Sequence, residues 1–187
     1  MCTPLNYLVW NIHGTSRSDS FRYLNDICHE YSIRLLVLIE PIMFDQHKDI
    51  IRVRLGFDST KPFNDGKIWV FWYNELACLP FVDQLLHLSI TLSSGVIIFL
   101  SIVYAKHFRV TRRPLWATLE VLADSMTQPW AITGDFNVVA SVDERRGGAA
   151  SRVSEIEEFR EAILHIGVDS LDFDGSPYIW TNGHLWQ

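Results

Sequence analysis

The stretch ITGDFNVV, residues 132–139, runs from apolar side chains straight into two polar ones, Asp135 and Asn137. The apolar part follows Pro129 and Trp130 and predicts a short buried β-strand. Polar side chains at its end add nothing to a hydrophobic core, whereas the end of a rigid strand holds a functional group well. We therefore predict that Asp135 and Asn137 belong to a functional site.

Three other predicted strands end in the same way. The run LNYLVWN ends at Asn11, and RLLVLIEP stops at Glu40, directly before a proline. The run GVIIFLSIVYA, residues 95–105, brings Tyr104 to its end. Between the first two strands, residues 19–31 carry apolar side chains at helical spacing. The first third of the chain is therefore expected to form a strand, a helix and a strand.

The rest of the chain predicts further strands and two helices. KIWVFWY (67–73), FVDQLLHLSITL (81–92) and GVIIFLSIVYA are rich in β-branched and aromatic residues, and we expect largely antiparallel strands. A helix over residues 112–126 has Pro114 near its start, and its apolar face comprises Leu115, Leu119, Leu122 and Met126. No repeat or linker interrupts the chain, so we expect one mixed α/β domain over residues 1–187.

A second helix is predicted over residues 154–167. Ser154 with Glu157 three residues later matches a capping box, and Gly167 follows the last apolar residue. The segment SPYIWTNGHLWQ, residues 176–187, predicts a final strand and turn. Helices therefore accompany strands throughout the sequence.

Composition narrows the functional classes. The 187 residues are 48% hydrophobic, with a net charge of -6 and three cysteines that form no CxxC pair. This composition predicts a folded chain without general affinity for polyanions, and it argues against a disulfide framework or a zinc site. We see no secretory signal, and the longest apolar run is about half of what a membrane span needs. We expect a soluble intracellular protein.

The polar strand ends suit metal-assisted phosphoester chemistry. Two carboxylates, Glu40 and Asp135, flanked by the Asn11 and Asn137 amides, match the oxygen ligands of Mg²⁺, and Mn²⁺ would fit as well. Taken singly, each residue has an ordinary explanation, such as a turn-forming Asp or an amphipathic Tyr104 at a strand rim. Only the combination favours a phosphodiesterase site, in which an Asp orients or deprotonates water.

These motifs resemble a known family. LVWNIHG, LLVLIEP, IVYA and ITGDFN, in this order, are similar to the endonuclease/exonuclease/phosphatase superfamily, which includes pancreatic deoxyribonuclease and exonuclease-III-type enzymes. KIWVFWYN, RRPLWATLEVL and PWAITGDFNVVASVDERRGGAASR resemble more closely the endonuclease domain of plant-type non-LTR (LINE-type) retrotransposons. The resemblance covers nearly the whole chain. It implies a two-sheet β-sandwich flanked by helices.

The resemblance also implies a role for each strand-end residue. Glu40 matches the metal-binding Glu, with Asn11 supporting the metal, and Tyr104 matches the Tyr that contacts the scissile phosphate. Asp135 and Asn137 match the water-activating Asp and its partner. In such retroelements the domain nicks DNA, and the released 3′ hydroxyl primes a reverse transcriptase that is fused in a longer protein. Acting on chromosomal DNA would place the chain in the nucleus.

The chain departs from the family pattern at three places. His107 replaces an active-site Asn, and Ile179 stands where relatives place Thr. The family continues past the position of Gln187 to a terminal SDH, so the resemblance implies a domain incomplete at its C-terminus and lacking its last strands. The alternatives left open are an inactive retroelement remnant with the same fold and, less favoured, a phosphatase for small phosphoesters.

Two basic loops are candidates for contact with DNA phosphates. HFRVTRR contributes Arg109, Arg112 and Arg113, and ERRGGAASR contributes Arg145 and Arg146. The alternative is that these arginines are ordinary solvated charges. No base-reading motif indicates a target sequence.

Overall fold

The computed structural model describes residues 5–12, 18–42, 47–73, 77–144, 152–172 and 174. The chain forms two compact units, the first of residues 1–105 with 126–135, the second of residues 106–125 with 136–187. Among the described residues, every helix is too short or too polar to cross a membrane.

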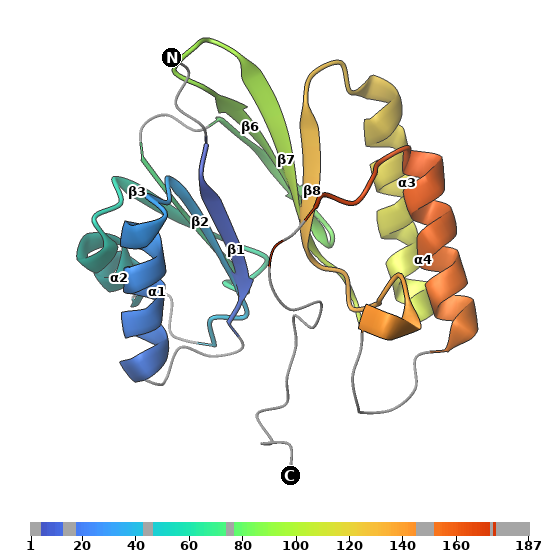
Figure 1. Cartoon of the computed structure of the whole chain (residues 1–187), viewed down its shortest axis with the longest axis horizontal. Coiled ribbons are helices and arrows are strands. Elements are labelled where there is room, and N and C mark those ends of the chain that lie inside the picture. Colours follow the sequence, from blue (N-terminus) through green and yellow to red (C-terminus); the bar gives the residue numbers. More distant parts are fainter. Residues whose placement is uncertain are drawn as a thin grey trace. The chain divides into compact units, whose positions relative to one another are not determined.

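The first unit contains two four-stranded sheets (Figure 1). One sheet has the order β1-β2-β4-β3, from β1 (Tyr7–Asn11), β2 (Leu35–Ile39), β4 (Ile68–Trp72) and β3 (Ser59–Phe63). The other has the order β5-β6-β7-β8, from β5 (Ala77–Val82), β6 (Leu85–Thr91), β7 (Ile97–Tyr104) and β8 (Trp130–Asp135). In each sheet one pair is parallel, β1 with β2 and β7 with β8, and the other pairs are antiparallel.

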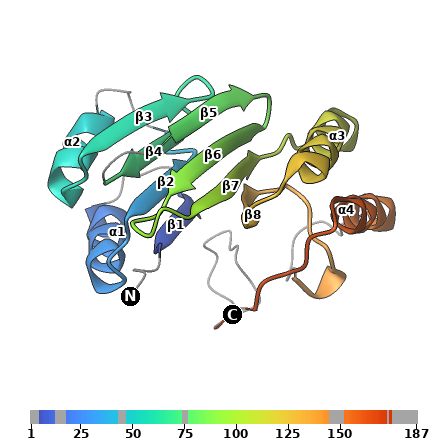
Figure 2. The same cartoon turned by 90° about the horizontal axis from the view of Figure 1, so that it is seen from above.

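The two sheets pack face to face, as Figure 2 shows from above. Alternate residues of the central strands point into the space between them, because successive side chains of a strand face opposite sides. This inner core comprises Leu35, Val37, Ile39, Ile68 and Val70 of one sheet with Leu86, Leu88, Ile90, Leu100 and Ile102 of the other. The predicted two-sheet sandwich is confirmed.

Two helices cover the outer face of the first sheet (Figure 2). They are α1 (Ser18–Glu30), as predicted, and α2 (His47–Leu55), which the sequence analysis did not predict. A second core forms there from Leu24, Cys28, Ile51 and Leu55 of the helices, Leu36, Leu38, Trp69 and Phe71 of the strands, and the loop residues Ile33 and Phe57. Strand β2 is buried on both faces as a result, which is why its sequence LLVLI is apolar without alternation.

The second unit is built on α3 (Arg109–Ser125) and α4 (Val153–Ile166), with a short 3₁₀ turn at Val142–Glu144. The two helices run side by side (Figures 1 and 2), and the rings of Trp116, Phe136 and Phe159 pack together between them. Trp116 is buried beside the predicted face residues Leu115 and Leu119. Aromatic packing therefore holds this unit together.

Several predicted boundaries are wrong in detail. Helix α4 is capped by Arg152 without a side-chain hydrogen bond, so Ser154 lies inside the first turn and is not the N-cap. Gly167 does end the helix, in the left-handed conformation. Pro114 is the sixth residue of α3 rather than close to its start. The stretch 81–92 is not one strand, because Asp83 and Gln84 form a turn between β5 and β6. The strand predicted over residues 176–187 lies outside the described residues.

Candidate active site

The carboxyl ends of four strands of the first unit carry the predicted site residues. Asn11 is the last residue of β1 and Glu40 follows β2, while Tyr104 ends β7 and Asp135 ends β8. The parallel register pairs Asn11 with Ile39 and Tyr104 with Asp135, so the strands of each pair end at the same level. Parallel pairing therefore brings these side chains to one edge of each sheet.

Two hydrogen bonds join the polar residues of one sheet to those of the other. The amide Nδ2 of Asn11 donates to Oδ2 of Asp135 over 2.8 Å. The hydroxyl of Tyr104 donates to Oε1 of Glu40. The structure thus brings together the four residues that the sequence predicted from four separate strand ends.

Tyr104 reports the electrostatics of this cluster. Its half-buried position, its hydrogen bond to Glu40 and the charges of the Glu40 and Asp135 carboxylates together hold the pKa of its hydroxyl well above the ordinary value. The phenol therefore keeps its proton throughout the neutral range and remains a hydrogen-bond donor. Burial is the largest of these causes, and the two carboxylates add to it.

The backbone at Glu40 has a conformation that residues with a side chain rarely adopt. Glu40 has a φ of 52°, in the left-handed region, immediately before the proline that closes the strand. Such a conformation costs on the order of 1–3 kcal/mol, and it is found mostly where the surrounding structure imposes it. The backbone N–H of Glu40 is held by the carbonyl of Lys67 over 2.8 Å. Hydrogen bonding thus fixes the left-handed turn that ends β2.

Gly134 lets strand β8 approach β7 closely. Its φ is 130°, and a Cβ there would lie 2.1 Å from the carbonyl oxygen of Val103. No other residue can stand at this position without moving the strand pair. The sequence analysis did not assign this role, although a glycine directly before the strand-end Asp was its signal.

The donor set suits a hard divalent cation. Glu40, Asp135 and Asn11 offer carboxylate and amide oxygens, and proteins commonly hold Mg²⁺ with only one or two carboxylates. The described residues contain no group of three or more His, Cys, Asp or Glu that could hold a metal. The Tyr104 hydroxyl bonds Glu40, and the Asn11 amide bonds Asp135, so both carboxylates belong to the same cluster. Glu40 is the residue that would hold the cation, with Asn11 in support and the Asp135 carboxylate adding negative charge nearby.

Asn137 and His107 belong to the second unit. Asn137 has a φ of 50°, and its backbone carbonyl accepts a hydrogen bond of 2.6 Å from Nη1 of Arg112. The side chain of His107 is exposed, and its carbonyl accepts a second hydrogen bond from the same nitrogen. Their roles stay predictions.

The expectation that Arg112 contacts DNA is wrong. Its side chain is only 2% exposed, and its guanidinium is engaged by backbone carbonyls and by Glu155. A side chain held inside the unit cannot reach a phosphate at the surface. Arg112 stands three residues before Leu115 and seven before Leu119, on the apolar face of the helix, and this spacing was the sequence signal of its burial.

Arg109 and Arg113 share one acidic partner. Both bind the Glu158 carboxylate, at 2.6 Å and 3.1 Å. Burial alone would raise the pKa of Glu158, but the hydrogen bonds from Arg113 and Arg109 outweigh it and lower the pKa. Arg113 remains 56% exposed, so it can still face a phosphate. Arg145 and Arg146 lie outside the described residues.

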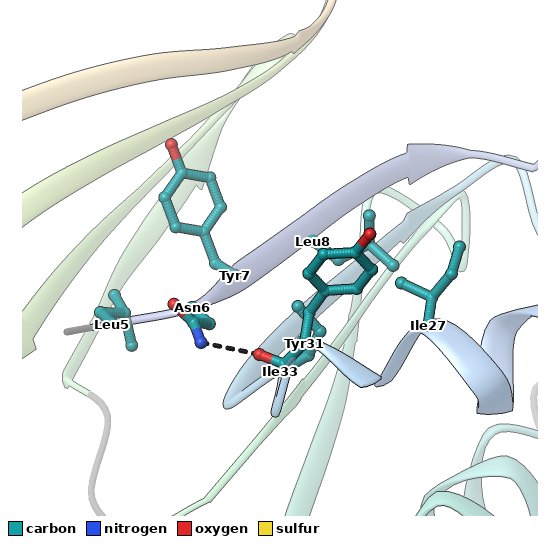
Figure 3. A pocket seen from close by; sticks show the side chains of 7 residues that line it. All are labelled: Leu5, Asn6, Tyr7, Leu8, Ile27, Tyr31 and Ile33. Carbon is teal, nitrogen blue, oxygen red and sulfur yellow. Dashed lines mark hydrogen bonds between the residues drawn. The ribbon is translucent and has the colours of Figure 1, made fainter. Parts of the chain in front are cut away.

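A hollow of about 410 Å³ lies at the opposite end of β1 (Figure 3). It is lined by Leu5, Asn6, Tyr7, Leu8, Ile27, Tyr31 and Ile33. Its walls are mainly apolar, and the Asn6 amide donates to the Tyr31 carbonyl over 2.7 Å. This hollow has no carboxylate and none of the predicted site residues.

Comparison with solved structures defines the fold. The AP endonuclease LMAP from Leishmania major matches with a TM-score of 0.61 at 16% identity, over 87% of this chain and 66% of that one. The endonuclease domain of TRAS1, a telomere-specific non-LTR retrotransposon, matches with a TM-score of 0.59 at 11% identity, over 88% and 71%. The chain has the fold of the endonuclease/exonuclease/phosphatase superfamily.

A third match is TDP2 from D. rerio in complex with a single-strand DNA product, with a TM-score of 0.54 at 18% identity, over 82% of this chain and 64% of that one. The chain thus spans about two thirds of the length of these solved structures. No family model matches the chain. No curated protein matches it either.

Proposed function

We propose that this chain is a Mg²⁺-dependent phosphodiesterase that nicks DNA. The observation that carries the proposal is the cluster of Asn11, Glu40, Tyr104 and Asp135, joined across two sheets by two hydrogen bonds. Asn11 and Tyr104 end strands whose other residues are mainly apolar, and Glu40 directly follows such a strand, so a hydrophobic core does not explain these polar side chains. The similar solved structures include two endonucleases, which supports phosphodiester hydrolysis over other chemistry.

In the proposed reaction, Asp135 accepts a proton from the attacking water or orients that water towards phosphorus. Asn11 restrains the rotation of the Asp135 carboxylate through its 2.8 Å hydrogen bond. Tyr104 keeps its proton, and its hydroxyl can donate to a phosphate oxygen. A Mg²⁺ ion would stabilise the negative charge that develops on the phosphate oxygens, and Glu40 is the residue that we expect to hold it.

The water oxygen forms a bond to phosphorus as the P–O3′ bond breaks, which leaves a 5′ phosphate and a 3′ hydroxyl. Asn137 and His107 are the additional residues that we propose for the site. The similarity to a retrotransposon endonuclease domain supports a role in target-site nicking, with a reverse transcriptase in a longer protein and nuclear DNA as the substrate.

The test is nicking of supercoiled plasmid in Mg²⁺ by the wild-type chain, by Glu40→Ala and by the wild type with EDTA. We expect nicked circles only from the wild type with Mg²⁺. A correctly folded wild type that produces no nicks would contradict the proposal and would support the alternative of an inactive remnant. Release of phosphate from a small phosphoester without nicking would instead support the phosphatase alternative.

A further inference from the structure

We propose that Arg112 is a positioning residue that holds the Asn137 loop in the shape that the reaction needs. The inference rests on the proposed function, in which Asn137 belongs to the site. It concerns only the second unit, where Arg112, His107, Asn137 and Glu155 are all described.

Arg112 is the most completely buried charged residue of the described part of the chain, with 2% of its side chain exposed. Its Nη1 donates to the Asn137 carbonyl over 2.6 Å and to the His107 carbonyl over 2.9 Å. Its Nη2 donates to Oε2 of Glu155 over 2.7 Å. A single guanidinium thus ties together the loop before α3, the loop after β8 and helix α4.

The cost of burying this charge indicates a specific task. Removing an ion from water costs several kcal/mol, and a buried pair of this kind is often no more stabilising than apolar packing. Glu155 supplies the opposite charge, with 25% of its side chain exposed. An apolar residue would fill the space next to Leu115 and Trp116 without that cost. What it would not do is bond two loop carbonyls.

The Asn137 loop contains a left-handed backbone turn. Asn137 has a φ of 50°, in a region that asparagine enters more readily than most residues with a side chain. The preceding Phe136 packs against Trp116 and Phe159, with ring centroids 6.5 Å and 5.1 Å away. The Phe136 ring and the Asn137 carbonyl are therefore held at neighbouring positions, which restrains the backbone that carries the Asn137 side chain.

Arginine is required because lysine cannot replace its geometry. The guanidinium presents several N–H groups in a rigid plane, whereas the lysine ammonium is a compact charge on a flexible stem. Arg112→Lys keeps the charge opposite Glu155 and releases part of the carbonyl contacts. This substitution therefore separates positioning from neutralisation of the buried acid.

The experiment compares Arg112→Lys, Asn137→Ala and the double variant, with Arg160→Met as the matched control on the exposed side of α4. Nicking kinetics and hydrogen exchange of the amides of residues 136–140 are measured on each folded protein. We expect Arg112→Lys to lower kcat roughly tenfold or more with KM within about twofold, because small displacements of a catalytic group cost rate. In the Asn137→Ala background the same substitution should cost little further, because both changes remove one function.

Exchange of the 136–140 amides should rise in Arg112→Lys and stay unchanged in Arg160→Met. Unchanged exchange, or a full loss of kcat added on top of that of Asn137→Ala, overturns the proposal. If the wild type does not nick, the proposed function fails, and the exchange measurement alone still decides whether Arg112 holds the loop.

Discussion

One asparagine directly precedes strand β1 and another ends it, and the two have different surroundings. Asn6 lies at the edge of an apolar hollow, and its amide bonds the Tyr31 backbone carbonyl over 2.7 Å. Asn11 lies at the carboxyl end, and its amide bonds the Asp135 carboxylate over 2.8 Å. Both side chains are exposed, so burial does not distinguish them.

The difference lies in the partner of each amide. A hydrogen bond to a backbone carbonyl in a loop gives that carbonyl a donor and stabilises the fold, typically by about 1 kcal/mol. A hydrogen bond to the Asp135 carboxylate orients a group that can take part in a reaction. A second carboxylate, that of Glu40, lies close by, since both carboxylates act on Tyr104. One end of the strand is thus structural and the other is a candidate site, although the residue type is the same.

Removing the Asp135 carboxylate, at the end of β1 where Asn11 lies, should have the largest effect on the nicking rate. We predict that Asp135→Asn lowers the rate of plasmid nicking by roughly a thousandfold or more, since the removed group accepts or orients the water proton. Thermal unfolding should change little. A variant that nicks within tenfold of the wild type would contradict the role of Asp135.

The next effect concerns the strand that carries this carboxylate. Gly134→Ala should destabilise the fold by about 3 kcal/mol, because the added Cβ would lie 2.1 Å from the Val103 carbonyl oxygen. Gly95→Ala is the control, since Gly95 also has a positive φ, 81°, but a Cβ there meets nothing within 4 Å. Urea denaturation compares the two. Equal losses would show that backbone strain, rather than the β7–β8 approach, limits both positions.

The pair Asn11→Ala and Asn6→Ala tests the comparison itself. Asn11→Ala should lower kcat about a hundredfold and leave stability nearly unchanged, since it frees the Asp135 carboxylate to rotate. Asn6→Ala should lower the free energy of unfolding by about 1 kcal/mol and leave kcat unchanged. Steady-state nicking and urea denaturation of both variants are the measurements. Equal losses of kcat in the two variants would remove the distinction between the two ends.

The smallest effect lies away from both ends, at His87 on β6. His87 shares a 2.8 Å hydrogen bond with Ser101, and burial lowers the pKa of the imidazole below its ordinary value. The unfolded chain then binds this proton more readily, so the stabilisation is present above about pH 6.5 and declines as the pH falls towards the folded pKa.

The free energy of unfolding of His87→Phe should therefore depend less on pH between about pH 7.5 and 5.5 than that of the wild type. Nicking at neutral pH should be unchanged. Urea midpoints measured across this range for both proteins are the test. The same pH dependence in the two proteins would show that other groups cause it.

The sequence predicted the parts of the fold that depend on local pattern. The apolar runs that end at Asn11, Glu40, Tyr104 and Asp135 correspond to real strands. In each sheet two of these strands are parallel neighbours, which explains why their terminal residues lie at the same edge of that sheet. The first helix followed equally from spacing. The two-sheet arrangement came from the resemblance to a family, because pattern alone does not determine how sheets pack.

The remaining features depend on tertiary contacts that a pattern does not contain. Helix α2 has charged residues at four of its nine positions, so its short apolar face of Ile51 and Leu55 was not recognised. Ser154 had the right residue type for a cap, but the chain enters α4 at Arg152. Arg112 falls on the helical face of Leu115 and Leu119, but its charge favoured a surface role, and only packing shows that it is buried.

Binding of a divalent cation tests the proposed metal site directly, because binding does not depend on turnover. Mn²⁺ serves as the probe, and its binding is followed by electron paramagnetic resonance for the wild type, Glu40→Gln, Asp135→Asn and Asn6→Ala. We expect Mn²⁺ to bind at least tenfold more weakly to Glu40→Gln and Asp135→Asn, and equally to Asn6→Ala and the wild type. Equal binding by all four proteins would contradict a cation site at the carboxyl ends of these strands.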